Sequence, residues 1–386
     1  GVFVGAKASS LVISSSSNVG VQGDALTLGK PLTVKTTGAL QILSDASSFS
    51  PALTLSSNLV LGNTLSSLTI GKTTNTSGIT LSGTNTVAGP IDIYGGALAI
   101  NGALTATNST LDLYATGAVT QTAAITASGL GLHGTGSFTL NNTSNSVSTL
   151  AGGDATTKLG NVSYTNAGAL TVDTVGSLSG LTSTGTVLVE TLSGDLALNQ
   201  NISTTNATAT AVWLNAGKSA ATGITTGGNV LITGPPTITA GAGGTIRLMT
   251  GSVSGSTGLT ILVGSGTGRF RYNSDETTTN YTVALSPNVV NAIYREQPTA
   301  TVDFGSNPYV ITYGDALQAF AYSQTSAQNG DAALTGYSTV IPTATYSTSN
   351  NIKASATPYA LSSSLRDLGY AKIGRASCRE RVSSPV

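Results

Sequence analysis

Two short stretches of this chain carry a carboxylate and a phenol in the same order. Residues 91–94 read Ile-Asp-Ile-Tyr and residues 111–114 read Leu-Asp-Leu-Tyr, twenty residues apart. If both stretches are strands on adjacent coils, Asp92 and Asp112 form a carboxylate pair, the arrangement that polysaccharide-cleaving enzymes use on a glycosidic bond. Tyr94 and Tyr114 supply rings on which a sugar can stack. These four residues are the candidates for glycan contact.

A plainer interpretation competes with this one and is the one we favour. Asp92 and Asp112 also fit an outward polar ladder on a strand surface, and the surrounding sequence has almost no Arg or Trp to build sugar subsites. We therefore expect no catalytic residues and no enzyme activity, and a polysaccharide-cleaving enzyme remains the alternative.

Other reactive side chains are scarce. His133 is the single histidine, which excludes a site with several His ligands, and alternation with Leu132 predicts an exposed strand position. Gly152-Gly153-Asp154 is typical of a turn, because no second unit of a calcium-binding repeat follows it. Serine is abundant, but no helix follows a nucleophile motif. We expect no metal and no cofactor.

The elements that must position these side chains are short strands. A small-apolar-polar-apolar pattern recurs at irregular intervals from about Leu28 to Ile261, separated by Gly, Asn, Ser and Thr, and no long stretch has helical periodicity. In each strand the apolar residues face inward, and residues such as Asp92 and Asp112 face solvent. Many short strands that cannot bury a core alone predict a stacked solenoid. The sequence therefore predicts an all-β protein whose residues 1–285 form a right-handed parallel β-helix.

The composition changes near Arg269, where aromatic residues, charges and prolines become more frequent. We expect a linker at 286–298 and a small, truncated β-sandwich-like domain at 299–371. Residues 372–386 are basic, contain Cys378, the single cysteine, and resemble an in-frame translation of a sequencing-library adapter, so we exclude them from the fold as an artefactual disordered tail.

Charge and hydropathy exclude several classes of partner. Only 8% of the residues are charged and the formal net charge is zero, which argues against nucleic acid as a partner. The longest apolar stretches are too short to span a membrane. We expect any signal peptide to lie upstream of Gly1.

Several short sequence segments resemble those of a known protein family. The chain resembles filamentous haemagglutinin-like adhesins of two-partner secretion in the segments 136–142 (Gly-Ser-Phe-Thr-Leu-Asn-Asn), 149–152 (Thr-Leu-Ala-Gly), 169–172 (Ala-Leu-Thr-Val), 214–217 (Leu-Asn-Ala-Gly) and 268–273 (Gly-Arg-Phe-Arg-Tyr-Asn). The stretch 311–316, Ile-Thr-Tyr-Gly-Asp-Ala, resembles the mostly-β MBG-type modules that follow such a β-helix.

The resemblance implies a secreted protein on a bacterial cell surface. It implies export through an outer-membrane secretion pore and a shaft that presents a binding region to glycans or proteins of a host or neighbouring cell. A remote alternative is an ice-binding solenoid, which the Thr-x-Thr pairs suggest but which needs one fixed coil period.

Overall fold

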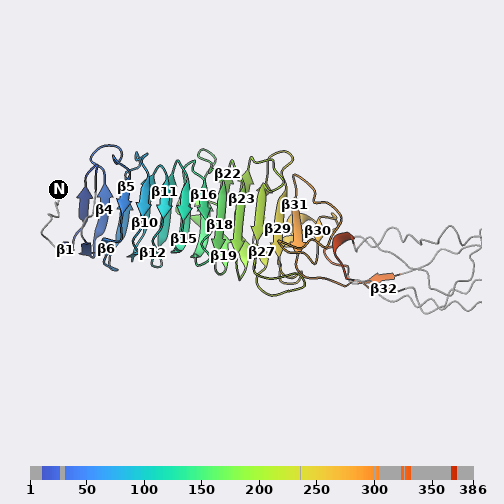
Figure 1. Cartoon of the computed structure of the whole chain (residues 1–386). Coiled ribbons are helices and arrows are strands. Elements are labelled where there is room, and N and C mark those ends of the chain that lie inside the picture. Colours follow the sequence, from blue (N-terminus) through green and yellow to red (C-terminus); the bar gives the residue numbers. More distant parts are fainter. Residues whose placement is uncertain are drawn as a thin grey trace, which may run out of the picture.

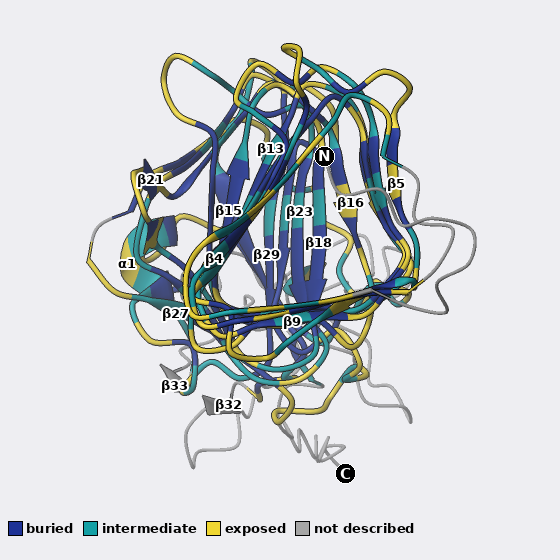
Figure 2. Ribbon diagram, turned by 90° about the vertical axis from the view of Figure 1, so that its left-hand side faces the viewer, coloured by how far each residue is buried: buried dark blue, intermediate teal, exposed yellow. Residues whose placement is uncertain are grey.

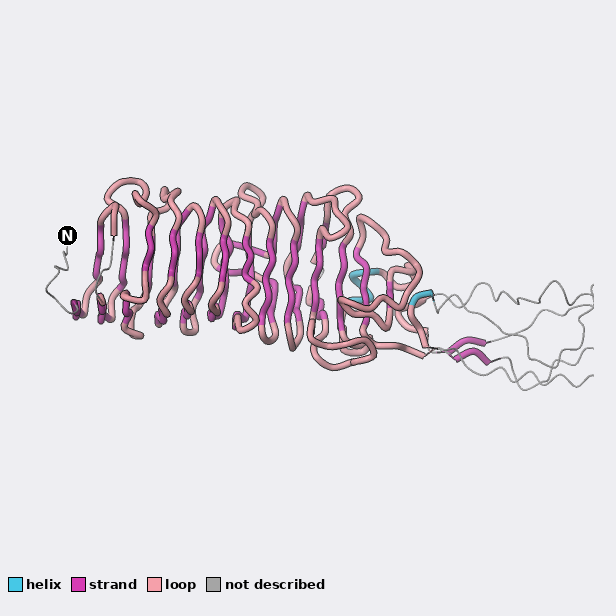
Figure 3. Tube along the Cα trace, viewed as in Figure 1, coloured by secondary structure: helices cyan, strands magenta, loops and turns pink. Residues whose placement is uncertain are grey.

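The chain forms a parallel β-solenoid of about 13 turns, whose strands lie across the long axis (Figure 1). The computed structural model describes residues 11–26, 31–234, 236–299, 301–303, 323–325, 327–331 and 367–371. Each coil contributes short strands joined by turns (Figure 3), and strands of successive coils pair in parallel, as residues 91–95 do with residues 111–115. The predicted β-helix fold is confirmed.

One 15-stranded sheet forms a wall of the solenoid and part of a second wall. Its main path is β2 (Val19–Gln22), β4 (Ala39–Leu43), β7 (Ser67–Ile70), β10 (Ile91–Gly95), β13 (Thr110–Ala115), β15 (Ile125–His133), β17 (Ser146–Gly152), β19 (Leu170–Val172), β24 (Leu196–Leu198) and β27 (Val230–Ile232). Strands off this path are β9 (Asn85–Val87), β12 (Leu104–Ala106), β22 (Leu181–Ser183), β25 (Ile202–Thr204) and β28 (Ile238–Thr239).

An 11-stranded sheet forms another wall. In spatial order it contains β5 (Leu53–Leu55), β8 (Ile79–Leu81), β11 (Leu98–Ile100), β14 (Val119–Gln121), β16 (Phe138–Leu140), β18 (Val162–Asn166), β23 (Val187–Thr191), β26 (Val212–Asn215), β29 (Ile246–Thr250), β31 (Val290–Tyr294) and β30 (Phe270–Arg271). Near the start of the described chain, β1 (Leu11–Ser15), β3 (Leu32–Thr36) and β6 (Leu59–Leu61) form a third sheet.

Strand register is kept while coil length varies. On the 11-stranded sheet an unbroken outward column joins ten partners: Thr54, Thr80, Ala99, Thr120, Thr139, Ser163, Leu188, Trp213, Arg247 and Asn291. Ile91 and Leu111 are partners twenty residues apart, whereas Leu196 and Val230 are partners 34 residues apart. The extra residues enter the turns, so strand length and stacking are unchanged.

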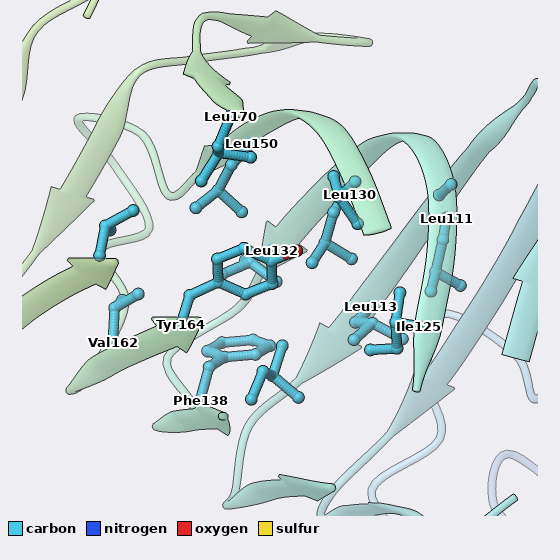
Figure 4. Packing of buried hydrophobic residues seen from close by; sticks show 14 of the residues in the cluster. Leu111, Leu113, Ile125, Leu130, Leu132, Phe138, Leu150, Val162, Tyr164 and Leu170 are labelled. Atoms are coloured by element: carbon cyan, nitrogen blue, oxygen red, sulfur yellow. The ribbon is translucent and has the colours of Figure 1, made fainter. Parts of the chain in front are cut away.

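The core is one continuous stack of mainly aliphatic side chains. Successive coils place Leu68, Ile91, Leu111, Leu130 and Leu150 in one inward column, and each is fully buried. Figure 4 shows such packing around Phe138 and Tyr164. Seen along the axis, buried residues line the inside and exposed residues gather at the turns (Figure 2). Burying each such side chain contributes about 1.5–3 kcal/mol, so stability grows with each coil.

Buried asparagines satisfy the backbone at corners of the coils. Asn145 Oδ1 accepts from Ile125 N at 2.8 Å, and its amide donates to Thr165 O at 3.0 Å. One coil further, Asn166 Oδ1 accepts from Val147 N at 2.9 Å. A buried backbone group without a partner costs about 1–3 kcal/mol, and these amides link neighbouring coils while removing that cost.

The solenoid extends beyond its predicted end at residue 285. Strand β31, which falls inside the predicted linker 286–298, pairs in parallel with β29 and is buried throughout. The linker prediction rests on the change of composition near Arg269, which does not show that this segment still forms a strand of the solenoid. Its Asn291 is buried because the amide donates to three backbone carbonyls, including that of Ile246.

A second difference concerns Ile261, which the strand pattern included. It lies in a five-residue helix, α1 (Leu259–Val263), and is 88% exposed. Leu259 and Val263 are the buried residues of this helix, and their spacing of four places both on one face.

Tyrosines close the core at the end of β31. Tyr272 stacks on Tyr294 with ring centroids 5.4 Å apart and meets Tyr370 edge-on at 4.6 Å. The hydroxyls of Tyr272 and Tyr370 both donate to Asp331 Oδ2, at 2.7 and 2.9 Å.

Little of the predicted second domain can be compared. Within 299–371, β32 (Thr301–Asp303) and β33 (Ser323–Thr325) pair antiparallel. Most of the predicted domain, and the whole tail at 372–386, lie outside the described residues.

Candidate functional site

The outward carboxylates of β10 and β13 lie side by side. The register pairs Asp92 with Asp112 and Tyr94 with Tyr114, while the intervening Ile and Leu side chains face the core. This is the relation that the twenty-residue spacing predicts. Partner strands lie about 4.8 Å apart, so the two carboxyl groups are neighbours on one surface.

An aromatic ladder runs beside the carboxylates and includes the single histidine. Tyr94 stacks on Tyr114 with centroids 4.2 Å apart and an interplanar angle of 16°. Tyr114 stacks on His133 of β15 at 4.0 Å and 17°. Each such pair contributes about 0.5–1.5 kcal/mol beyond its buried area. The ladder of Tyr94, Tyr114 and His133 therefore stiffens three consecutive coils.

A hydrogen bond links the ladder to the carboxylates. His133 Nε2 lies 2.8 Å from Asp112 Oδ1, and the two side chains are only 16% and 15% exposed. An ionised carboxylate can only accept, so Nε2 donates and Asp112 fixes the orientation of the imidazole. His133 thus differs from the freely exposed strand residue that alternation predicts.

Glycine makes this bond possible. Gly131 is the strand partner of Asp112, and a Cβ at this position would clash with Asp112 Oδ1 and lie 3.1 Å from His133 Nε2. Gly129, two residues earlier on the same outward face, leaves room for Val175, whose methyl groups would lie 3.2 and 3.3 Å from an added Cβ. Glycine within a strand often marks a close approach of this kind. The sequence Gly-Leu-Gly-Leu-His at 129–133 is therefore the signal from which a contact between His133 and the carboxylate pair could have been predicted.

Burial and like charge act on the same groups. Burial first, and then the neighbouring charge of Asp112, raises the pKa of Asp92, while His133 opposes the shift. Burial is also the largest cause of the raised pKa values of Tyr94 and Tyr114, which keeps both phenols neutral.

A hairpin forms a wall beyond the ladder. Strands β20 (Thr174–Val175) and β21 (Leu178–Ser179) pair antiparallel, and Val175 and Leu178 pack on the outward Ala151 of β17. Between this hairpin and the turn after β17 lies a cavity of about 220 Å³, lined by Tyr114, His133, Gly134, Gly153, Asp154, Thr157 and Leu178.

The cavity and the carboxylate pair are separate features. Asp92 and Asp112 are not among the residues that line the cavity, so the pair does not face an enclosed space in which a glycosidic bond would be held. The facing surfaces of Tyr94 and Tyr114 stack on each other, so these two surfaces are not available to a sugar, and the prediction that the two residues contact a glycan stays a prediction. Among the described residues no ring stacks on either terminal face of the ladder, that of Tyr94 or that of His133, and the cavity lies at the His133 end.

Two further findings concern metal ions and membranes. Within the described parts of the chain, no group of three or more His, Cys, Asp and Glu side chains is placed to hold a metal ion. A helix of the length and apolarity needed to cross a membrane is likewise not found among the residues that the structure describes.

Comparisons with known proteins do not assign the chain to a family. No protein-family model matches the chain, and searches of curated proteins and of solved structures find no match.

Proposed function

We propose that the solenoid is the shaft of a secreted bacterial cell-surface adhesin of the filamentous haemagglutinin-like type. The observation that carries this proposal is the uninterrupted stack of about 13 turns around one continuous core. Each coil contacts only its neighbours, so length is added without a change in design. This construction is suited to holding a binding region away from a surface.

The walls of the solenoid support the same role. Outward positions on the 11-stranded sheet are mainly Thr, Ser and Ala, for example Thr54, Thr80, Ala99, Thr120 and Thr139. Such uncharged walls, in a chain of which only 8% of the residues are charged, limit nonspecific electrostatic attraction. The partners in this proposal are glycans or proteins of a host or neighbouring cell, and nucleic acid is not among them.

The same local construction supports export as part of this proposal. Coils that form contacts only with adjacent coils can fold in sequence after passing an outer-membrane pore. The proposal therefore places the chain outside the cell, with an MBG-type module following the shaft.

Antibodies against the solenoid test this proposal on intact cells of the source organism. We expect labelling without permeabilisation, and reduced attachment to host or neighbouring cells when the gene is deleted. Labelling only after permeabilisation, or unchanged attachment of the deletion strain, would overturn the proposal.

The enzyme alternative is tested with the purified chain and a panel of polysaccharides. We expect no release of reducing ends. Turnover that is lost in Asp112→Asn and kept in Asp45→Asn would instead establish the carboxylate pair as catalytic.

A further inference from the structure

The aromatic ladder ends at a cavity. Strand register pairs Leu132 with Gly152, so the position beyond His133 on the next coil is Gly153, which has no side chain. Gly153 has a φ of 62°, and there the chain leaves the sheet. The face of the imidazole turned away from Tyr114 therefore has no ring stacked on it among the described residues.

The cavity offers one apolar side. Leu178 stands on the hairpin β20–β21 and lines the cavity together with the rings of Tyr114 and His133. Packing of Leu178 on Ala151 holds the hairpin against the sheet. The volume of about 220 Å³ lies below the 300–1,000 Å³ that are usual for drug-sized ligands, so it fits a single small ring.

The other side of the cavity is polar and fixed by hydrogen bonds. Asp154 Oδ1 accepts from the backbone of Thr156 and Thr157 at 2.7 Å each, and from the Thr156 hydroxyl at 2.6 Å. These bonds, that of the Thr156 hydroxyl first, lower the pKa of Asp154, so the carboxylate stays ionised at neutral pH. Its Oδ2 has no hydrogen-bond donor among the described residues and remains free to accept.

The charge around the cavity selects the ligand. Asp154 lines it, Asp112 lies behind His133, and no Lys or Arg is among the lining residues. An anionic ligand would meet like charge. A ring with hydroxyl groups on its edge and C–H groups on its face matches both sides, because the C–H face packs on an aromatic ring and the hydroxyls donate to the carboxylate.

We propose that this cavity binds one uncharged pyranose, with its C–H face on His133 and its hydroxyls directed to Asp154. Tyr94 and Asp92 lie outside this subsite. Asp112 acts by holding the imidazole, so it is a positioning residue. The proposal concerns one wall of the solenoid and does not depend on the shaft proposal.

The single histidine provides the readout. Because His133 is the only histidine in the chain, its two ring C–H signals can be assigned in an NMR spectrum of the full chain. The probes are methyl β-D-glucopyranoside, methyl β-D-galactopyranoside and sodium glucuronate, added at constant ionic strength. We expect a saturable shift of the His133 signals with at least one neutral glycoside, and at least about tenfold weaker binding of glucuronate.

Two variants separate the subsite from nonspecific effects. Asp154→Asn removes the charge that accepts the sugar hydroxyls, and we expect about tenfold weaker binding, because a hydrogen bond to a charged acceptor is replaced by one to a neutral amide. Asp45→Asn, on an exposed turn, is the matched control and should bind like the parent chain. Thermal unfolding of both variants checks that the solenoid is intact.

A third variant tests the ring face itself. His133→Phe keeps an aromatic face but loses the bond to Asp112, and we expect it to retain binding by saturation-transfer NMR, whereas Leu178→Ala weakens it. No shift with either neutral glycoside up to saturation of the solution would overturn the proposal. Equal affinity for glucuronate, or equal shifts in Asp154→Asn and Asp45→Asn, would do the same.

Discussion

The carboxylate of Asp112 occupies the space that a side chain at Gly131 would fill. The two residues are register partners on β13 and β15, and the missing Cβ lets Asp112 Oδ1 reach His133 Nε2 at 2.8 Å. Three coils are thereby connected on their outer face, since Tyr94 stacks on Tyr114 and Tyr114 on His133. One glycine thus decides whether the carboxylate column and the aromatic ladder form a single cluster.

Gly131→Ala is expected to break this cluster. The added methyl group displaces the Asp112 carboxylate, and loss of a charged hydrogen bond lowers the free energy of unfolding by about 1–2 kcal/mol. Urea unfolding measures the loss, and the His133 ring signals should shift. Gly168→Ala, where an added Cβ meets no atom within 4 Å, should not lower stability, and equal effects of the two substitutions would contradict this role of Gly131.

The sequence predicted the carboxylate register but not the cluster. Asp92 and Asp112 could be aligned because matched apolar neighbours lie twenty residues apart, and alternation then sets their face. His133 was considered alone, because its coil carries Gly131 where the previous coils carry aspartate. A pattern of repeated residue types does not reveal a position at which a missing side chain creates the contact.

The end of the solenoid was missed for a different reason. Strand β31 is buried throughout, so it lacks the alternation by which the earlier strands were found. Near this end of the solenoid the guanidinium of Arg271 donates to backbone carbonyls, including Val283 O at 2.9 Å and Ala284 O at 2.7 Å. These contacts depend on the paths of irregular loops, which the periodicity of the strands does not predict.

Asp92→Asn should change how stability depends on pH. Burial and the charge of Asp112 raise the pKa of Asp92 above its ordinary value of 3.8. Because the pKa of Asp92 is higher in the folded state, protonation of Asp92 stabilises the fold. This contribution is fully present below the pKa of the unfolded state and is lost as the pH rises through the pKa of the folded state. The variant should therefore be more stable than the parent chain at pH 7, by a margin that shrinks as the pH falls toward 3.8.

Urea unfolding of both proteins at several pH values measures this margin. Asp45→Asn serves as the exposed control and should show no comparable change of margin. A margin for Asp92→Asn that is constant from pH 7 to below 4, or that grows on acidification, would contradict the raised pKa.

Phe138→Ala tests the stacked core. Phe138 is 1% exposed and packs among the inward residues of β16 and its neighbours. Truncating such a ring typically costs about 3–5 kcal/mol because it leaves a cavity. Thr139→Ala, one residue on and facing outward, should change stability by less than about 0.5 kcal/mol. Similar losses for both, measured by thermal unfolding, would mean that the assigned faces are wrong.

Arg295→Met probes the cap at the end of the solenoid. Arg295 is fully buried, donates to Ala220 O and Ala216 O at 2.7 Å each, and pairs with Glu276. Removing one partner of a buried pair costs about 3–5 kcal/mol, so we expect a loss at the lower end of this range, with faster amide exchange in β29 and β31. Arg269→Met, at a partly exposed position, is the control, and stability of Arg295→Met equal to that of this control would show that the cap is dispensable.

The rod of stacked coils is tested most directly by distances along its axis. In a chain carrying Cys378→Ser, spin labels are placed at Thr54 and Ser163, or at Thr54 and Leu188, which lie five and six strand steps apart in one outward column. At about 4.8 Å per step, pulsed electron paramagnetic resonance should give narrow distributions near about 24 and 29 Å. Broad distributions, or a distance that does not lengthen with the added coil, would contradict the shaft.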